Sequence, residues 1–502
     1  MRPRNTLVAL LVLAALGAYV YWVELPRQAR QAEEKRLLAF DKESVTAVTL
    51  DYADRSIALD KSPEGRWRIV RPIEADADET AVKNMVNAIA DAQVTRTLED
   101  VADKLPSYGL DKPEATITLR LKDGTDLPPI KVGTTTQVGF SAYVQKGADP
   151  EVYITAAAFQ SGMKKDLKDL RDKSVIAFED KDVQQIELRR RTGGIVIERQ
   201  GEGDRWEIAA PARYPADSSE VRALLASARG LRADDFVSDH ASADLGTYGL
   251  TSPQLTLSVW LGKDRAQKTL LIGGVHEDPQ KKTLYAKRGE RPTVYTIADY
   301  SFKNLDKDLG TLRDKTVLPF EKEKTAKIAV TRKEGAGFTL AKREGTWHVE
   351  GPGEGTERAP TISRFVDDVA GLKGNEIVAE GGVDLAKYGL DDPDVSIAVS
   401  DENGAPLGTL MAARGTAGGG SDAEAQSFVA AQDRGIVYGV KPYVYDRIDK
   451  RAADLREPPA TPVPSGAATA SPAEQAAALP FDEENLGIDD EGLDDKEWPE
   501  ED

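Results

Sequence analysis

The side chains with the most reactive chemistry in this sequence are three histidines and a large number of carboxylates. His240, His276 and His348 lie far apart in the chain and are not repeated. Catalytic and metal sites need groups that support one another, yet H-E-x-x-H, G-x-S-x-G and a glycine-rich dinucleotide turn are all missing. The chain contains no cysteine, which excludes thiolate nucleophiles, disulfides and cysteine-ligated metals. Paired carboxylates stay open, because the meeting of two acids in space is not visible in a sequence.

These residues favour a protein that is not an enzyme and has no cofactor and no metal. The formal net charge is −19, and residues 482–502 contain twelve acidic residues and one lysine, so the tail contributes −11 of it. Nucleic-acid binders normally carry a basic face, and we expect no nucleic-acid partner. We interpret the run Arg189-Arg190-Arg191 as the solvated end of a strand.

The most informative pattern is a hexapeptide, Y-G-L-x-x-P, that occurs three times with 140 residues between copies. Its glycine permits a backbone angle that is closed to other residues, and its proline prepares the entry of a following strand. We predict a structural role, with the tyrosine packed over the preceding helix. The residues of the motif are Tyr108, Gly109, Leu110 and Pro113; Tyr248, Gly249, Leu250 and Pro253; and Tyr388, Gly389, Leu390 and Pro393.

The elements around the hexapeptide recur in the same order. A W-x-[IV]-x-x-P strand begins at Trp67, Trp206 and Trp347, and an amphipathic helix follows, with apolar residues at i, i+3, i+4 and i+7. After the hexapeptide come further strands, including a hairpin with two aromatic residues ten positions apart. Each unit closes on a short helical segment that ends in LRDK or LRE. Repeats with such short joints are typical of modules that stack on one another.

The predicted fold class is α+β. We expect three tandem modules, each a mostly antiparallel β-sheet with one main amphipathic helix and a short C-terminal helix. The predicted boundaries are 37–173, 174–315 and 316–456. The third module departs from the others, because the glycine-rich stretch 415–426 replaces a short turn there. This stretch lacks the Gly-Lys-Ser/Thr ending of a phosphate loop, which favours a flexible loop.

The two ends of the chain differ from the modules. Residues 5–25 contain the apolar run LVALLVLAALGAYVYWV, which predicts one transmembrane anchor with an aromatic exit belt. A cleaved signal peptide is the alternative. Residues 457–502 read as a Pro/Ala-rich linker followed by a disordered acidic tail. The tail is either purely solvating or docks on a partner through its apolar residues, which are Phe481, Leu486, Ile488, Leu493 and Trp498.

The recurring set of F-x7-[VI]-x-[LV], W-x-[IV]-x-x-P, Y-G-L-x-x-P and LRDK resembles a bacterial family catalogued as domain of unknown function 4340. The resemblance covers about residues 37–456 in three copies. Members of that family are typically anchored by one N-terminal helix and exposed outside the cytoplasmic membrane. Some resemble auxiliary components of gliding-motility-type ABC transport systems. The resemblance implies a location and no catalytic residue.

We therefore expect a single-pass protein of the bacterial inner membrane whose body faces the periplasm or the cell exterior. The first hypothesis is a non-enzymatic scaffold or accessory subunit of a cell-envelope or ABC-transport-type complex, with protein partners. The alternative is an extracytoplasmic binding module for envelope glycan or peptide. It predicts exposed aromatic residues on one sheet face, whereas a scaffold predicts apolar patches between modules and at the tail.

Overall fold

The structure of the protein is a computed structural model. It describes residues 35–136, 141–201, 203–241, 245–415 and 426–457, together with the isolated positions 16, 19 and 22. The rest of the predicted anchor, residues 416–425 of the glycine-rich loop and the predicted docking tail lie outside the described residues. Among the residues that the structure describes, no helix has the length and apolar character needed to cross a membrane.

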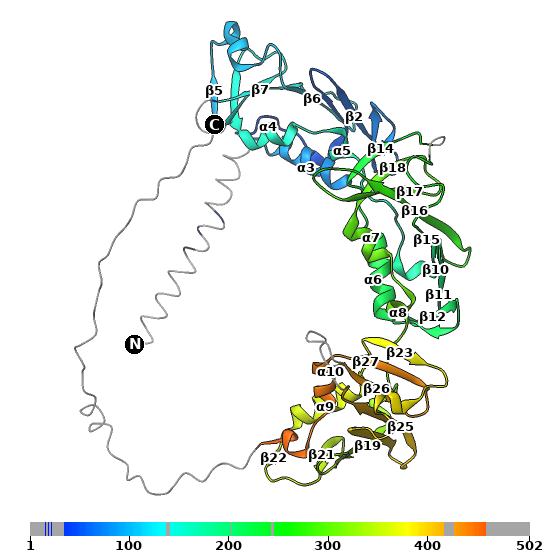
Figure 1. The fold of residues 1–502 in the computed structure, drawn as a ribbon. Coiled ribbons are helices and arrows are strands. Elements are labelled where there is room, and N and C mark those ends of the chain that lie inside the picture. Colours follow the sequence, from blue (N-terminus) through cyan, green and yellow to red (C-terminus); the bar gives the residue numbers. More distant parts are fainter. Residues whose placement is uncertain are drawn as a thin grey trace, which may run out of the picture. The chain divides into compact units, whose positions relative to one another are not determined.

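The chain divides into two compact units, one that ends at Asp314 and one that begins at Lys315. The first unit contains two nine-stranded sheets and the second an eight-stranded sheet, each with its helices (Figure 1). We call these sheets, with the elements that follow one another around them, the first, second and third module.

The first module orders its strands β4-β3-β2-β1-β6-β7-β8-β9-β5, with antiparallel pairing throughout. Its chain crosses from one sheet edge to the other after the main helix, α3. The elements are η2 (Lys42–Ser44), β1 (Val45–Asp51), β2 (Ser56–Lys61), β3 (Trp67–Arg71), β4 (Ala75–Asp76), α3 (Glu79–Ala90), β5 (Arg96–Leu98), η3 (Ala102–Tyr108), β6 (Ala115–Leu121), β7 (Ile130–Thr135), β8 (Ser141–Lys146), β9 (Val152–Ala156), α4 (Ala157–Met163) and α5 (Leu167–Leu170).

The second module repeats this order as β13-β12-β11-β10-β15-β16-β17-β18-β14. Its elements are η4 (Asp180–Asp182), β10 (Val183–Arg190), β11 (Gly193–Arg199), β12 (Trp206–Ala210), β13 (Tyr214–Pro215), α6 (Ser218–Arg229), β14 (Asp235–Ser238), β15 (Leu255–Leu261), β16 (Ala266–His276), β17 (Thr283–Arg288), β18 (Val294–Ala298), α7 (Asp299–Leu305) and α8 (Leu309–Leu312).

The third module has the order β21-β20-β19-β24-β25-β26-β27-β23, and β22 pairs separately with β28. Its elements are η5 (Lys322–Lys324), β19 (Thr325–Arg332), β20 (Phe338–Arg343), β21 (Thr346–Glu350), β22 (Thr356–Glu357), α9 (Ala359–Ala370), β23 (Glu376–Glu380), η6 (Leu385–Tyr388), β24 (Val395–Asp401), β25 (Pro406–Ala413), β26 (Ser427–Ala431), β27 (Ile436–Val440), α10 (Pro442–Ile448), η7 (Ala452–Leu455) and β28 (Arg456–Glu457).

The first two sheets share one strand order, and the third repeats it without the short edge strand, which confirms the predicted α+β fold of tandem repeats. In each module the main helix lays one apolar stripe on the sheet and so closes the main core. Asp78 and Asp217 begin α3 and α6, because each carboxylate accepts hydrogen bonds from two amides of the first turn. In α9, Pro360 stands in the first turn instead. The predicted stripes are buried in all three helices: Val82, Met85, Val86 and Ile89; Val221, Leu224, Leu225 and Ala228; and Ile362, Phe365, Val366 and Val369.

Candidate functional site

The Y-G-L-x-x-P motif forms the same corner in each module. Gly109, Gly249 and Gly389 have φ angles of 67°, 66° and 65°, in the left-handed region. The leucine that follows is buried, and the next strand starts five residues after it in every module: β6 after Leu110, β15 after Leu250 and β24 after Leu390. Pro113, Pro253 and Pro393 precede these strands.

The prediction that the motif tyrosines pack over the main helix is wrong. Tyr108 lies 4.7 Å from Tyr143 between ring centroids, in a small apolar cluster with Leu110 and Val152. Tyr143 and Val144 are neighbours in β8, so they point to opposite faces of the sheet. Val144 belongs to the main core under α3. The corner therefore covers the face of the sheet that the helix leaves open.

The other two modules build the same second cluster. Tyr248 contacts Tyr285 at 5.0 Å and Tyr388 contacts Phe428 at 5.2 Å, both edge to face. Each partner is the first aromatic residue of the predicted hairpin pair, while the second, Tyr295 or Tyr438, packs in the main core. The ten-residue spacing correctly predicted a hairpin. It did not reveal that the two aromatic residues of the hairpin pack on opposite faces of the sheet.

The three predicted tryptophans lie in β3, β12 and β21, in the half of each sheet away from the repeated corner. Each has a cation from the neighbouring strand near its ring. Lys61 stands over Trp67 at 5.8 Å, Arg199 over Trp206 at 4.4 Å and Lys342 over Trp347 at 5.9 Å. The three pairs are also direct partners in strand register. Such contacts stabilise the strand pairing.

A second recurring feature joins the end of the first strand of each module to the helix that follows the last strand of its hairpin, which is α4, α7 or α10. In the first module the Tyr52 hydroxyl donates to the Met163 carbonyl at 2.7 Å. The same strand position holds Arg190 in the second module, and its guanidinium binds the Asp306 carboxylate and the Lys307 carbonyl. The Arg190 side chain is only 19% exposed. The prediction of a solvated arginine run was therefore wrong for Arg190, because the chain just after α7, at Asp306 and Lys307, covers it.

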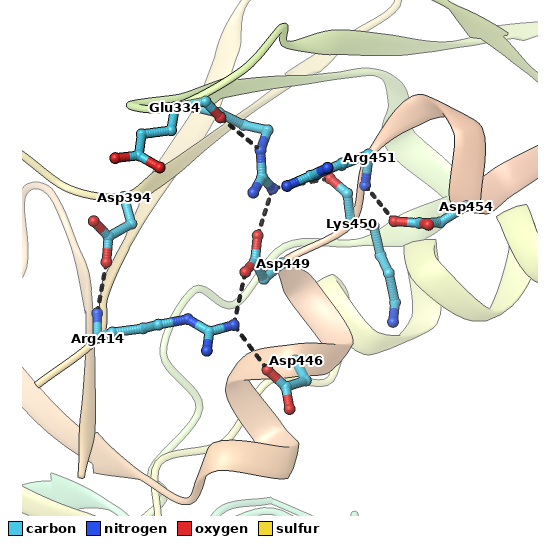
Figure 2. A network of polar contacts seen from close by, with 9 residues as sticks. Glu334, Asp394, Arg414, Asp446, Asp449, Lys450, Arg451 and Asp454 are labelled. Carbon is cyan, nitrogen blue, oxygen red and sulfur yellow. Dashed lines mark hydrogen bonds and ion pairs between the residues drawn. The ribbon is translucent and has the colours of Figure 1, made fainter. Parts of the chain in front are cut away.

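In the third module this contact expands into a polar network (Figure 2). Asp449 binds Arg332 through one carboxylate oxygen and Arg414 through the other, the latter at 3.0 Å. Arg332 and Asp449 have side chains only 10% and 13% exposed. Burial opposes ionisation of Asp449, but the hydrogen bonds from Arg332 and Arg414 prevail and lower its pKa.

Arg414 anchors the strand end that leads into the glycine-rich stretch. Its amide donates to Asp394 at 2.8 Å, and its guanidinium also binds Asp446 (Figure 2). The guanidinium stands 4.8 Å from the centroid of the Tyr445 ring. Burial, together with the charges of Asp449 and Asp394, raises the pKa of Tyr445 to about 12. The network thus holds ionised groups of both signs against one another, and no member is placed as a free nucleophile or base.

The first two modules meet through a buried arginine at the end of the first LRDK segment. Arg171 donates to both carboxylate oxygens of Asp239, at 3.1 and 2.6 Å, and its guanidinium lies 3.6 Å from the centroid of the Phe236 ring. Its side chain is 8% exposed. A bidentate pair that also stacks on a ring fixes both position and angle. Arg171 therefore joins the end of the first module to β14 of the second.

Further ion pairs cross the same junction. Arg232 binds Asp78 at 2.8 Å, and Asp78 uses its other oxygen to cap α3. Arg291 lies 3.6 Å from Asp76. Beside these contacts the two modules enclose a cleft of about 480 Å³, which we call the junction cleft. The residues that line it are Pro72, Ile73, Glu74, Ala75, Asp76, Arg171, Asp172, Ser174, Phe236, Asp239, His240, Arg288, Arg291, Pro292, Thr293 and Tyr295.

The histidines do not assemble a reactive group. His276 contacts the Tyr285 hydroxyl at 2.8 Å, and His348 contacts Glu357 at 3.0 Å, each within its own module. His240 lines the junction cleft. Among the described residues, no three His, Asp or Glu side chains are close enough together to hold a metal ion.

A family model for a "domain of unknown function (DUF4340)" matches three segments of the chain, 67–205, 206–360 and 347–500. These segments begin at Trp67, Trp206 and Trp347, the tryptophans that open the repeated strand. The chain belongs to the DUF4340 family. The family assignment and the threefold repetition that the sequence predicted are both confirmed.

No curated protein matches the chain. Among solved structures, the chain aligns with a DNA polymerase sliding clamp from Pseudomonas aeruginosa over 82% of its own length and 95% of that chain, at 9% identity and a TM-score of 0.12. A sliding clamp from Caulobacter crescentus aligns over 82% and 94%, at 12% identity and a TM-score of 0.12. With TM-scores this low, these similarities carry no argument about fold or function.

Proposed function

We propose that this DUF4340 protein is a non-enzymatic scaffold or accessory subunit of a cell-envelope or ABC-transport-type complex. The observation that supports it most is the junction of the first two modules. Its charged side chains, Arg171 and Arg232 foremost, are occupied with partners across the junction. They hold two sheets in one unit, which gives a long surface for other proteins.

The same proposal includes a membrane anchor within residues 5–25 and a body outside the cytoplasmic membrane. It draws on the apolar run and its aromatic end, and on the typical topology of DUF4340 proteins. An anchored body of tandem modules suits a subunit that connects a membrane complex with the envelope around it.

Exposed aromatic residues offer contact points for such a partner. Tyr300 and Tyr443 are 71% and 55% exposed, and each is the second residue of its helix, α7 or α10. Tyrosine is enriched at protein interfaces, and here it stands at one repeated position. The alternative function, a glycan-binding module, predicts such side chains on a sheet face, and these two lie on helices.

Crosslinking in native membranes tests the proposal. A photoreactive residue at Tyr300 or Tyr443 of the full-length protein should give a small set of adducts with membrane or envelope proteins. The same position in α4 of the first module, Ala158, serves as the matched control. A second arm removes residues 458–502 and tests whether the tail is needed for the same adducts.

The proposal fails if neither position gives a protein adduct while the purified protein binds isolated envelope glycan saturably. That result would support the alternative. Unchanged adducts after removal of residues 458–502 would restrict the scaffold surface to the modules and exclude a docking role for the tail.

A further inference from the structure

The junction cleft contains a tyrosine whose counterpart in the first module has acceptors that it lacks. Tyr153 and Tyr295 hold the same place in their hairpins, opposite Val144 and Ala286. The Tyr153 hydroxyl donates to Asp149 at 2.6 Å and lies 3.0 Å from Glu151. These carboxylates stand four and two residues before the tyrosine.

In the second module the corresponding positions hold Arg291 and Thr293. Neither residue replaces the lost acceptors, and the Tyr295 hydroxyl makes no hydrogen bond to any of the residues that the structure describes. The side chain is nevertheless 93% buried, since its exposed fraction is 7%, and it lines the junction cleft. The hydroxyl has no protein acceptor among the described residues at the wall of this cleft, so it can donate to an acceptor that enters the cleft.

The charges around this hydroxyl are mainly positive. Burial raises the pKa of Tyr295, while the guanidinium groups of Arg288, Arg291 and Arg171 lower it and Asp172 raises it further. Two of the three arginines are engaged: Arg171 with Asp239 and Arg288 with Glu290.

Arg291 is the arginine free to turn toward a ligand. Its side chain is 53% exposed, and among the described residues its guanidinium approaches one carboxylate, that of Asp76 at 3.6 Å. The acids of the cleft are less available to repel an anion. Asp239 is bound by Arg171, and the Asp172 carboxylate accepts from the Ser174 amide. Asp76 lies 3.6 Å from Arg291 and 3.9 Å from Arg68, and Glu74 is exposed.

We propose that the junction cleft binds a carboxylate-bearing ligand, which accepts a hydrogen bond from Tyr295 and is neutralised by Arg291. The ligand supplies to Tyr295 the acceptor that Asp149 supplies to Tyr153 in the first module. A cleft of about 480 Å³ lies within the size range of small-molecule sites. This inference concerns a ligand of the cleft and does not depend on the scaffold function.

Calorimetric titration of the full-length protein with N-acetylglutamate tests this site. The neutral diamide of the same size, N-acetylglutamine amide, serves as the uncharged control ligand, and inorganic phosphate is titrated separately. We expect saturable binding of N-acetylglutamate and none of the diamide. Tyr295→Phe, which keeps the ring and removes only the hydroxyl, should weaken the binding about tenfold. Tyr153→Phe is the matched control and should leave the affinity unchanged.

A second variant transfers the acceptors of the first module into the second. Arg291→Asp combined with Thr293→Glu gives Tyr295 its own carboxylates and should abolish binding, while circular dichroism and the melting temperature stay close to wild type. The proposal is overturned if N-acetylglutamate does not bind saturably, if Tyr295→Phe binds it as well as wild type, or if phosphate alone binds.

Discussion

The end of the first strand is hydrogen-bonded to the end of a helix by a tyrosine in the first module and by an arginine in the second and third modules. Tyr52, Arg190 and Arg332 each bond a carbonyl at the end of α4 or just after α7 or α10, and so hold that helix against the end of the first strand. An arginine does this only with a carboxylate beside it, because an unpaired buried charge is costly. Asp306 and Asp449 meet that need.

We predict that Asp449→Asn destabilises the third module by about 3 kcal/mol, because it leaves Arg332 buried without a counter-charge. The change is measured as the loss of hydrogen-exchange protection in β19 and α10 of the full-length protein. Asp446→Asn is the matched control. Its carboxylate is 58% exposed and also binds Arg414, so its loss should cost less than about 1 kcal/mol. Equal effects of the two substitutions would contradict the assigned role of Asp449.

The pH dependence of the same pair has a definite sign. Since the folded-state pKa of Asp449 is lowered, its stabilisation is present above the unfolded value of 3.8 and is lost as the pH falls through the folded value. The difference in stability between wild type and Asp449→Asn should therefore shrink on acidification below about pH 4. A difference that stays constant down to pH 2 would argue against an ionised Asp449.

Opposite to that of Asp449, the contribution of Tyr445 to stability is lost on the alkaline side of the pH range. Its pKa is raised to about 12, above the unfolded value of 10.0, so its stabilisation is complete below pH 10 and is lost as the pH rises toward 12. Tyr445→Phe removes the ionisable group and should make α10 less sensitive to alkali than in wild type. Hydrogen exchange of α10 at pH 9 and pH 11 measures this. Equal alkali sensitivity of the two proteins would refute the assignment.

At the scale of elements, the repeated corner closes the second face of each sheet, and its glycine meets a different neighbour in each module. A Cβ at Gly249 would lie 2.7 Å from the backbone nitrogen of Gly274. At Gly109 the nearest atom is the Thr134 methyl, also at 2.7 Å, and at Gly389 it is the Ala413 Cβ at an ordinary 3.5 Å. The backbone angle is the same at all three positions.

The three Gly→Ala substitutions should therefore differ in cost. Gly389→Ala carries only the strain of a positive φ, about 1 kcal/mol. Gly249→Ala adds a clash with backbone and should cost about 3 kcal/mol, with Gly109→Ala between them. Hydrogen exchange in β25, β16 and β7 of the full-length variants measures the order. A Gly389→Ala variant that is the least stable of the three would show that the corner is not built as described.

Much of this element scale was predictable from sequence. Helical periodicity identified the buried stripes because one side of an amphipathic helix must face a core, as Val82 and Ile89 do. Alternation identified strands for a similar reason. Alternation could not show that the two faces of a strand pack against two different elements. Tyr108 was therefore predicted to pack on the main helix, whereas it packs on the other face of the sheet. Arg190 was also missed, since burial of a charge depends on Asp306, which lies 116 residues away.

At the scale of the molecule, the predicted stacking of neighbouring modules is supported within the unit that ends at Asp314. In the sequence, the LRDK segment predicts only the end of a helix. No acidic residue near its arginine in the chain indicates that this arginine joins two modules. Its role becomes visible only where Arg171 meets Asp239 and Phe236 of the next module. The sequence therefore indicated where the modules join, and the structure shows which contacts join them.

Arg171→Ala should loosen the junction, because Asp239 then stays behind without its bidentate partner. We expect faster hydrogen exchange in β14 and α5 of the full-length protein, and normal exchange in β1 and β10, which lie inside their own sheets. Arg291→Ala removes an exposed pair at 3.6 Å in the same junction and should change little.

The distance between the first and second modules tests the central claim most directly, that buried pairing at the junction makes one scaffold unit of two sheets. The chain lacks cysteine, so Lys83→Cys on α3 and Ala223→Cys on α6 allow two spin labels at unique sites. Pulsed electron resonance on the full-length protein should give one narrow distance distribution, which broadens in the Arg171→Ala background. A broad distribution in the protein that retains Arg171 would contradict the account.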